Sequence, residues 1–226
     1  MPTHLSSQRW NAFVDLVIGG MMALSFISKL PRGKQQELLD DLNYLNISEI
    51  KSFCKRHSIP YRIAVGTKDG RRRLTRDDDR KGVMLDRIRH FLKTGVILKE
   101  TCFQATVVCL DPLSDPITAD DRLFYGQYEK TNRTMIALLK SLTEGQFENG
   151  AIARILARDF WSRGKAPTFR EYASAWTHAS REHLRPNPEW AFLSDRANNV
   201  AVPDWKNLRR QKASRVMKML NQITSG

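Results

Sequence analysis

Hydrophobic side chains recur at intervals of three and four residues along most of the chain, and this spacing predicts a mainly α-helical protein. In the first half, the pattern predicts helices over residues 8–29, 34–43, 47–58 and 80–94. In the second half, it predicts helices from Thr118 or Asp120 to Leu142, over 147–162, from Thr168 through Trp176, and over 204–223. Asn46 with Glu49 and Thr168 with Glu171 have the spacing of capping boxes, and Asp79 is the expected N-cap of the 80–94 helix.

One segment departs from the helical period. Residues 62–67 and 71–75 are short runs that flank Lys68-Asp69-Gly70. Asp-Gly is a strong signal for a tight hairpin turn, because both residues tolerate a positive φ. The sequence therefore predicts a short β-hairpin with a very basic second strand, and a further strand or packed extended segment at 101–110.

Proline pairs divide the chain into three parts. Asp111-Pro112-Leu113-Ser114-Asp115-Pro116 cannot continue a helix, and Arg185-Pro186-Asn187-Pro188 forms a second break. The expected parts are an N-terminal helical region (1–110), a helical domain (117–184) and a C-terminal tail with a terminal helix (186–226).

The apolar segment around residues 10–30 is expected to be a core helix. Asp15 and the Gly19-Gly20 pair interrupt it, and it is too short to span a bilayer. We therefore expect no membrane association. The three cysteines, Cys54, Cys102 and Cys109, lack the number and spacing of a disulfide framework or a zinc site, so they are expected to be small apolar residues in a reducing cytoplasm.

The net positive charge of the chain limits the kinds of partner that the protein is expected to bind. The 226 residues carry 37 Lys and Arg against 24 Asp and Glu, a formal charge of +13. An excess of this size favours an anionic partner such as nucleic acid. Fourteen of the basic residues and only five acidic ones lie between Lys51 and Lys93. Against this, Asp77-Asp78-Asp79 could neutralise the arginine run locally, and the hairpin could be a solvated loop without a partner.

Residues 43–93 resemble a SAP domain, a short helix–connector–helix module that binds DNA. The first half of the family pattern is matched by Leu45, Glu49-Ile50-Lys51, Cys54-Lys55 and Ile59-Pro60, and the second half by Lys81, Met84-Leu85 and Arg87-Ile88. The family connector is a few residues ending in Gly-x-Lys, whereas here Tyr61 to Arg80 takes its place. The basic hairpin would thus be an insertion.

A weaker resemblance lies in the second region. Gly164 to Phe169, with Ala173 and Trp176, is similar to a small helical domain of unknown function that follows SAP-like modules in some bacterial proteins. The expected fold is therefore mainly α. It comprises a SAP-like module with an inserted hairpin, a second small helical domain and a C-terminal helix.

The leading hypothesis is a non-enzymatic DNA-binding protein with an architectural, regulatory or mobile-element accessory role, located in the cytoplasm on the nucleoid. Phosphate-cradling, hydrolase and metalloprotease motifs are missing from the sequence, so we expect no catalytic residue, metal or cofactor. Two alternatives remain, an RNA-binding protein and an inhibitor or adaptor that binds an acidic protein, and the second region is the expected surface for a protein partner. The candidate nucleic-acid contacts are Lys51, Lys55, Arg56, Arg62, Lys68, Arg71, Arg72, Arg73, Arg76, Arg80, Lys81 and Arg87.

Overall fold

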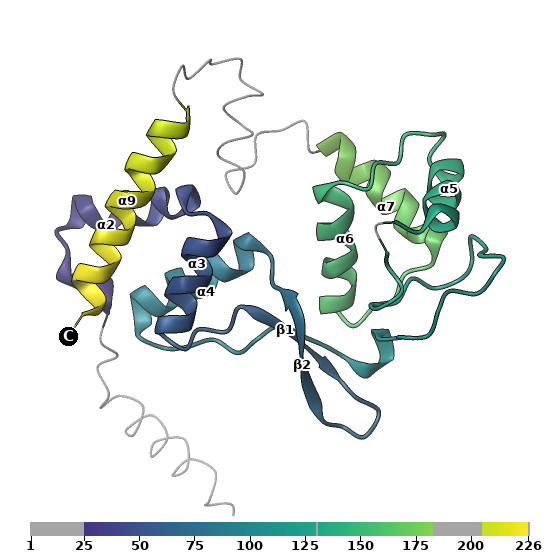
Figure 1. The fold of residues 1–226 in the computed structure, drawn as a ribbon, viewed down its shortest axis with the longest axis horizontal. Helices are drawn as coiled ribbons and strands as arrows, with labels where there is room; N and C mark the ends of the chain where they lie inside the picture. The colour runs from purple at the N-terminus through teal and green to yellow at the C-terminus, as the bar shows by residue number, and fades with distance from the viewer. Residues whose placement is uncertain (1–24, 130, 183–204, 226) are drawn as a thin grey trace, which may run out of the picture.

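The structure, a computed structural model, describes residues 25–129, 131–182 and 205–225. These residues form two lobes, each around its own hydrophobic core, with a small sheet between them (Figure 1). The elements of the first lobe are η1 (Phe26–Lys29), α2 (Arg32–Asp41), η2 (Leu42–Tyr44), α3 (Ile47–Arg56), α4 (Lys81–Thr94) and α9 (Trp205–Thr224).

The C-terminal helix α9 completes the N-terminal core. Val216, Leu220 and Ile223 are fully buried in one cluster with residues of α2, α3 and α4. In Figure 1 the yellow α9 lies against the purple α2, although the two helices stand at opposite ends of the chain. The first lobe is therefore built from both ends of the sequence.

The second lobe is rich in aromatic residues. Its elements are β3 (Cys102–Phe103), η3 (Ala105–Val107), α5 (Arg133–Leu142), α6 (Ala151–Ser162) and α7 (Phe169–Glu182). Phe103, Trp161, Tyr172 and Trp176 are buried in its core. These rings pack edge-on or tilted, at centroid separations typical of aromatic pairs.

The sheet joins the lobes. Its order is β2-β1-β3, with β1 (Arg62–Gly66) antiparallel to β2 (Arg72–Asp78) and parallel to β3. Ile59, just before β1, belongs to the first core, whereas Ile63 and Val65 belong to the second. The chain therefore passes from the first core to the second as it enters β1, while β2 is left on the open edge.

A buried ion pair fixes the roots of the three strands. Arg87 of α4 lies 3.0 Å from the carboxylate of Asp79, with side chains only 5% and 4% exposed. The same guanidinium donates to the carbonyl oxygen of Pro60 at 3.1 Å and to the hydroxyl of Thr101 at 2.7 Å. Pro60 precedes β1, Asp79 follows β2 and Thr101 precedes β3, so one side chain gathers all three strands.

Most sequence predictions about local structure are confirmed. The hairpin forms, the helices over 34–43, 47–58, 80–94 and 204–223 are found within a few residues of their expected bounds, and the chain is mainly helical. Both capping boxes are present. The 101–110 segment contributes the short strand β3. Most of the predicted 8–29 helix lies outside the described residues.

Two predictions are wrong. The helix expected from Thr118 or Asp120 begins only at Arg133, capped by Asn132, because tertiary hydrogen bonds hold the preceding backbone in an extended form. Leu123 N–H donates to the Pro167 carbonyl at 2.7 Å, and Tyr125 N–H donates to that of Val107 at 2.9 Å. Arg80, not Asp79, is the N-cap of α4, because the Asp79 carboxylate is occupied by Arg87 and Thr101.

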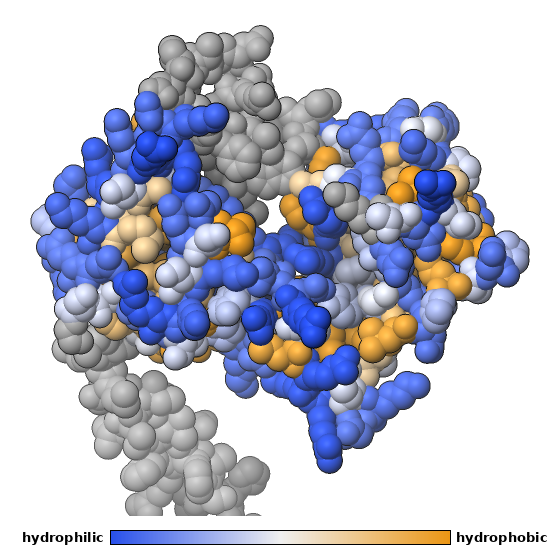
Figure 2. All heavy atoms as spheres, in the orientation of Figure 1, coloured by the Kyte–Doolittle hydropathy of each residue, from blue (hydrophilic) through white to orange (hydrophobic). Residues whose placement is uncertain are grey.

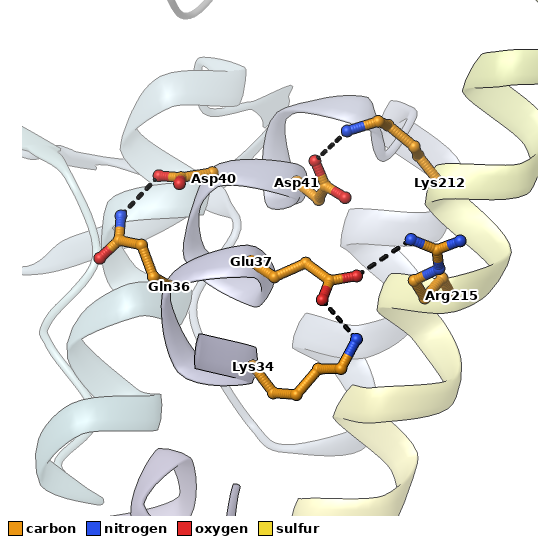
Figure 3. A network of polar contacts seen from close by, with 7 residues as sticks. All are labelled: Lys34, Gln36, Glu37, Asp40, Asp41, Lys212 and Arg215. Atoms are coloured by element: carbon orange, nitrogen blue, oxygen red, sulfur yellow. Dashed lines mark hydrogen bonds and ion pairs between the residues drawn. The ribbon is translucent and has the colours of Figure 1, made fainter. Parts of the chain in front are cut away.

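Ion pairs line the contact between α9 and α2. Arg215 lies 3.0 Å from Glu37, and Lys212 lies 2.7 Å from Asp41 (Figure 3). Arg209, one turn earlier on α9, pairs with Glu49 of α3. Much of the positive charge of α9 is thus used to dock the helix onto its own lobe.

The buried pair predicts a large effect of removing its cation. Arg87→Met keeps most of the side-chain volume but leaves Asp79 buried and unpaired, so we expect the free energy of unfolding to fall by about 3–5 kcal/mol. Urea denaturation measures this change. The double variant Arg87→Met/Asp79→Leu should recover a large part of the loss, because no unpaired charge remains. A single variant as stable as the wild type would contradict the assigned role.

The packing of α9 predicts a contrast between its apolar and its charged face. Leu220→Ala removes a fully buried side chain and should lower the free energy of unfolding by about 2–5 kcal/mol. Arg215→Ala should leave stability near that of the wild type, because an exposed ion pair contributes little. Thermal and urea unfolding of both variants test this. If Leu220→Ala and Arg215→Ala were equally stable, α9 would not belong to this core.

Candidate nucleic-acid interface

The hairpin, here β1, the turn 67–71 and β2, carries the densest group of candidate cations. Its turn closes with hydrogen bonds from Thr67 N–H to the Arg71 carbonyl at 2.9 Å and from Gly70 N–H to the Thr67 carbonyl at 3.0 Å. Gly70 has φ +78°, the conformation for which the Asp-Gly signal selects. The Thr67 hydroxyl and the Arg71 backbone N–H bind the Asp69 carboxylate and lower its pKa.

Six basic side chains, the hairpin cations, face solvent on this element. All are exposed, and between the first and the last of them the sequence holds only one acidic residue. Figure 2 shows hydrophilic side chains covering the end of the hairpin where it protrudes below the body. The hairpin cations are Arg62, Lys68, Arg71, Arg72, Arg73 and Arg76.

The hairpin cations have few and weak internal partners. Arg71 pairs with Asp69 at 3.3 Å and Arg72 with Glu100 at 3.6 Å, but these arginine side chains remain 85% and 62% exposed. Lys68, Arg73 and Arg76 have no ion pair or side-chain hydrogen bond within the described part of the chain. The group therefore keeps most of its charge available.

The adjacent acidic run does not neutralise these arginines. Asp77 accepts from the hydroxyl of Tyr125 at 2.6 Å, Asp78 binds Lys51 at 2.8 Å, and Asp79 is buried with Arg87. Each carboxylate is directed to a group outside the hairpin. Local neutralisation, which the sequence left open, is thus not how the three aspartates are used.

Strand alternation places the hairpin arginines on both faces of the ribbon. In the β1–β2 ladder, Arg73 lies opposite Val65 and Arg72 lies opposite Gly66. Side chains that follow each other along a strand therefore point to opposite faces of the ribbon. Gly66 lies against the second lobe, where a Cβ atom would come within 3.0 Å of the Ala105 backbone nitrogen. The ribbon is thus packed against the second lobe as far as the end of β1, whereas residues 68–71 of the turn beyond it are exposed.

The candidate cations of the helix pair α3–α4 are placed differently. Lys51 binds Asp78, and Arg80 pairs with Asp159 of α6 at 2.7 Å. Arg56 donates to Asn221 of α9 at 2.6 Å, and Lys81 donates to the Asn43 carbonyl. Lys55 alone of this group is both exposed and without a partner among the described residues. The helix pair therefore uses most of its positive charge inside the fold.

The prediction that Arg87 contacts nucleic acid is wrong. The Arg87 side chain is 5% exposed and bound to Asp79, Pro60 and Thr101. A polyanion cannot reach it without breaking the core of the sheet. Its place in the SAP-like pattern says nothing about exposure, because a charged residue on a helix is buried or free according to what packs against it.

The structure also shows basic residues that the sequence analysis missed. Arg154 and Arg158 stand one turn apart on α6 and line a pocket beside the end of β2, together with Tyr125 and Tyr128. The only sequence feature that pointed to this pair was its spacing of four residues, which places both arginines on one face of a helix. Nothing local to α6 indicates that the hairpin lies beside it.

Comparison with protein-family models, curated proteins and solved structures finds no match to this chain. Within residues 25–129, 131–182 and 205–225, no cluster of histidine, cysteine and carboxylate side chains is arranged to hold a metal ion. No helix in these ranges is long and apolar enough to cross a membrane. Cys54 is buried in the first core, where burial raises its pKa to about 11.

Proposed function

We propose that this protein binds nucleic acid, duplex DNA foremost, through the backbone contacts of its protruding basic hairpin, and that it acts without catalysis. The observation that supports this proposal is the group of six hairpin cations, all exposed and with little internal neutralisation. The three carboxylates that follow the arginines, those of residues 77–79, are held by Tyr125, Lys51 and Arg87 instead.

Counterion release supplies the driving force for such binding. Each phosphate that a Lys or Arg side chain neutralises releases condensed cations from the duplex. Six such contacts would weaken binding by roughly a thousandfold between low and moderately high salt. A two-stranded ribbon also has dimensions that fit the major groove, and this hairpin presents cations on both faces.

The resemblance to SAP domains is consistent with this proposal but shifts its emphasis. In this chain the helix pair supports the hairpin, and of the candidate contacts on the pair only Lys55 is exposed and without a partner among the described residues. We therefore assign the main contact to the hairpin and a minor one to the end of α3. Such a protein would act in the cytoplasm on the nucleoid, with the second lobe open to a protein partner.

The hairpin predicts a specific loss on charge removal. Arg73→Gln/Arg76→Gln removes two exposed, unpaired cations, so we expect duplex affinity to fall about tenfold and the salt slope to shrink by about two. Fluorescence anisotropy with a labelled 20-base-pair duplex, at several salt concentrations, measures both. The matched control is Arg133→Gln/Lys140→Gln on α5, which removes the same charge from exposed positions away from the hairpin.

Three further arms separate the alternatives. Lys55→Ala/Arg56→Ala measures the share of α3, and an equal length of duplex RNA as competitor separates DNA from RNA binding. A pull-down from nuclease-treated lysate tests for an acidic protein partner.

Duplex affinity that does not change with salt, or equal losses of affinity in the hairpin and α5 variants, would refute phosphate binding by the hairpin. A stoichiometric protein retained without nucleic acid, with no duplex binding, would favour the adaptor alternative.

A further inference from the structure

A pocket of about 400 Å³ opens beside the end of β2, at the root of the hairpin. It lies between Asp77 of β2, the Tyr125–Tyr128 segment and α6, and Trp161 is at its floor. Asp77, which lines it, directly follows Arg76, the last of the hairpin cations, in the sequence. Its volume is within the range of small-molecule sites.

The aromatic wall of the pocket is held rigidly. Tyr125 packs edge-on against Trp161 with ring centroids 5.5 Å apart, and the indole N–H of Trp161 donates to the Leu123 carbonyl at 3.0 Å. The Tyr128 hydroxyl donates to Asn149 at 2.7 Å. Both tyrosines are half-buried, so their hydroxyls are fixed while the rings border the pocket. Such a wall suits a flat aromatic ligand.

The wall formed by α6 is cationic. Arg154 lines the pocket and donates from its Nε atom to the Gly150 carbonyl at 3.3 Å, so its terminal N–H groups have no partner among the described residues. Arg158 has no ion pair or hydrogen bond to any described residue, and the small side chain of Ala157 also lines the pocket. Two guanidinium groups one helical turn apart can bind one phosphate group together.

Asp77 gives the pocket a hydrogen-bond acceptor on the opposite side. One of its oxygens accepts from Tyr125 at 2.6 Å. Burial and this carboxylate raise the pKa of Tyr125 to about 12, so the phenol stays a donor. The carboxylate can accept from an amino or ring N–H group and repels phosphate, which directs the anionic end of a ligand to α6.

We propose that this pocket binds one unpaired nucleotide, its base against Tyr125 and Tyr128 and its phosphate on Arg154 and Arg158. This inference rests on the proposed function, because the hairpin would hold the adjoining duplex. A base inside a duplex is stacked and paired, so the pocket can take only a nucleotide at an overhang, a gap or a flipped position. The protein would therefore prefer duplexes that carry a single-stranded end.

The first arm of the test uses free ligands and the full chain. Guanosine 5′-monophosphate should shift the amide resonances of the 125–128 segment and α6 at millimolar concentration, and ribose 5-phosphate and inorganic phosphate should bind at least about fivefold more weakly. Arg154→Gln/Arg158→Gln should abolish this response, and Arg133→Gln/Lys140→Gln should keep it. No response in the wild type, or an unchanged one in the pocket variant, overturns the assignment of a nucleotide site.

The second arm uses a blunt duplex and the same duplex with a three-nucleotide overhang. The wild type should bind the overhang form roughly fivefold to a hundredfold more tightly, the range expected from stacking one base. The pocket variant should lose this ratio and keep its blunt-duplex affinity, whereas Arg73→Gln/Arg76→Gln should weaken both duplexes and keep the ratio. A ratio near one in the wild type refutes the preference for unpaired ends.

The two proposals fail in different ways. If neither duplex binds while guanosine monophosphate does, the hairpin function is wrong and the pocket is a site for free nucleotides. If duplexes bind through the hairpin and the monophosphate does not, the pocket assignment is wrong. Unchanged circular dichroism and melting temperature of the variants confirm that lost binding is not lost folding.

Discussion

The direction of the hairpin depends on one buried ion pair. Arg87 holds Asp79 at 3.0 Å and also binds the backbone at Pro60 and the hydroxyl of Thr101. Because the cost of removing two charges from water is high, a buried pair adds little net stability, but an unmatched partner is strongly unfavourable. The pair therefore selects one arrangement of the three strands on α4. A ribbon that protrudes from the fold needs such an anchor, since β2 has a neighbour on one side only.

This constraint divides the positive charge into two classes. Several cations of the helix pair and of α9 bind carboxylates or backbone oxygens of the fold itself, as Arg80 does with Asp159 and Lys212 with Asp41. Cations of the hairpin have few such partners: Arg71 and Arg72 form ion pairs but stay 85% and 62% exposed, and the ribbon protrudes from the body (Figure 1). Within the described residues, the hairpin thus carries the densest group of cations that remain available to a polyanion.

Local signals were sufficient for the elements but not for their assembly. The Asn46–Glu49 box and the Asp69-Gly70 turn act over a few residues, and the structure has both where the sequence placed them. The late start of α5 depends on Leu123 binding the Pro167 backbone, a contact that no local pattern encodes. The candidate site divides in the same way. Hairpin residues could be found from turn chemistry, whereas the burial of Arg87 and the nearness of Arg158 depend on long-range packing.

Strand β2 changes sign along its length, from Arg71–Arg76 at its outer part to Asp77–Asp79 at its root. A duplex backbone would be attracted to the outer part of β2, whereas the root of β2 itself offers it no cation. Beside Asp77, Arg154 and Arg158 of α6 line the aromatic pocket, and neither has an ion-pair partner among the described residues. A single nucleic-acid strand that leaves the duplex there meets guanidinium groups that bind phosphate and aromatic rings that stack on a base. A paired base cannot use these rings. The sign change is therefore what separates a surface for duplex from a site for a single nucleotide.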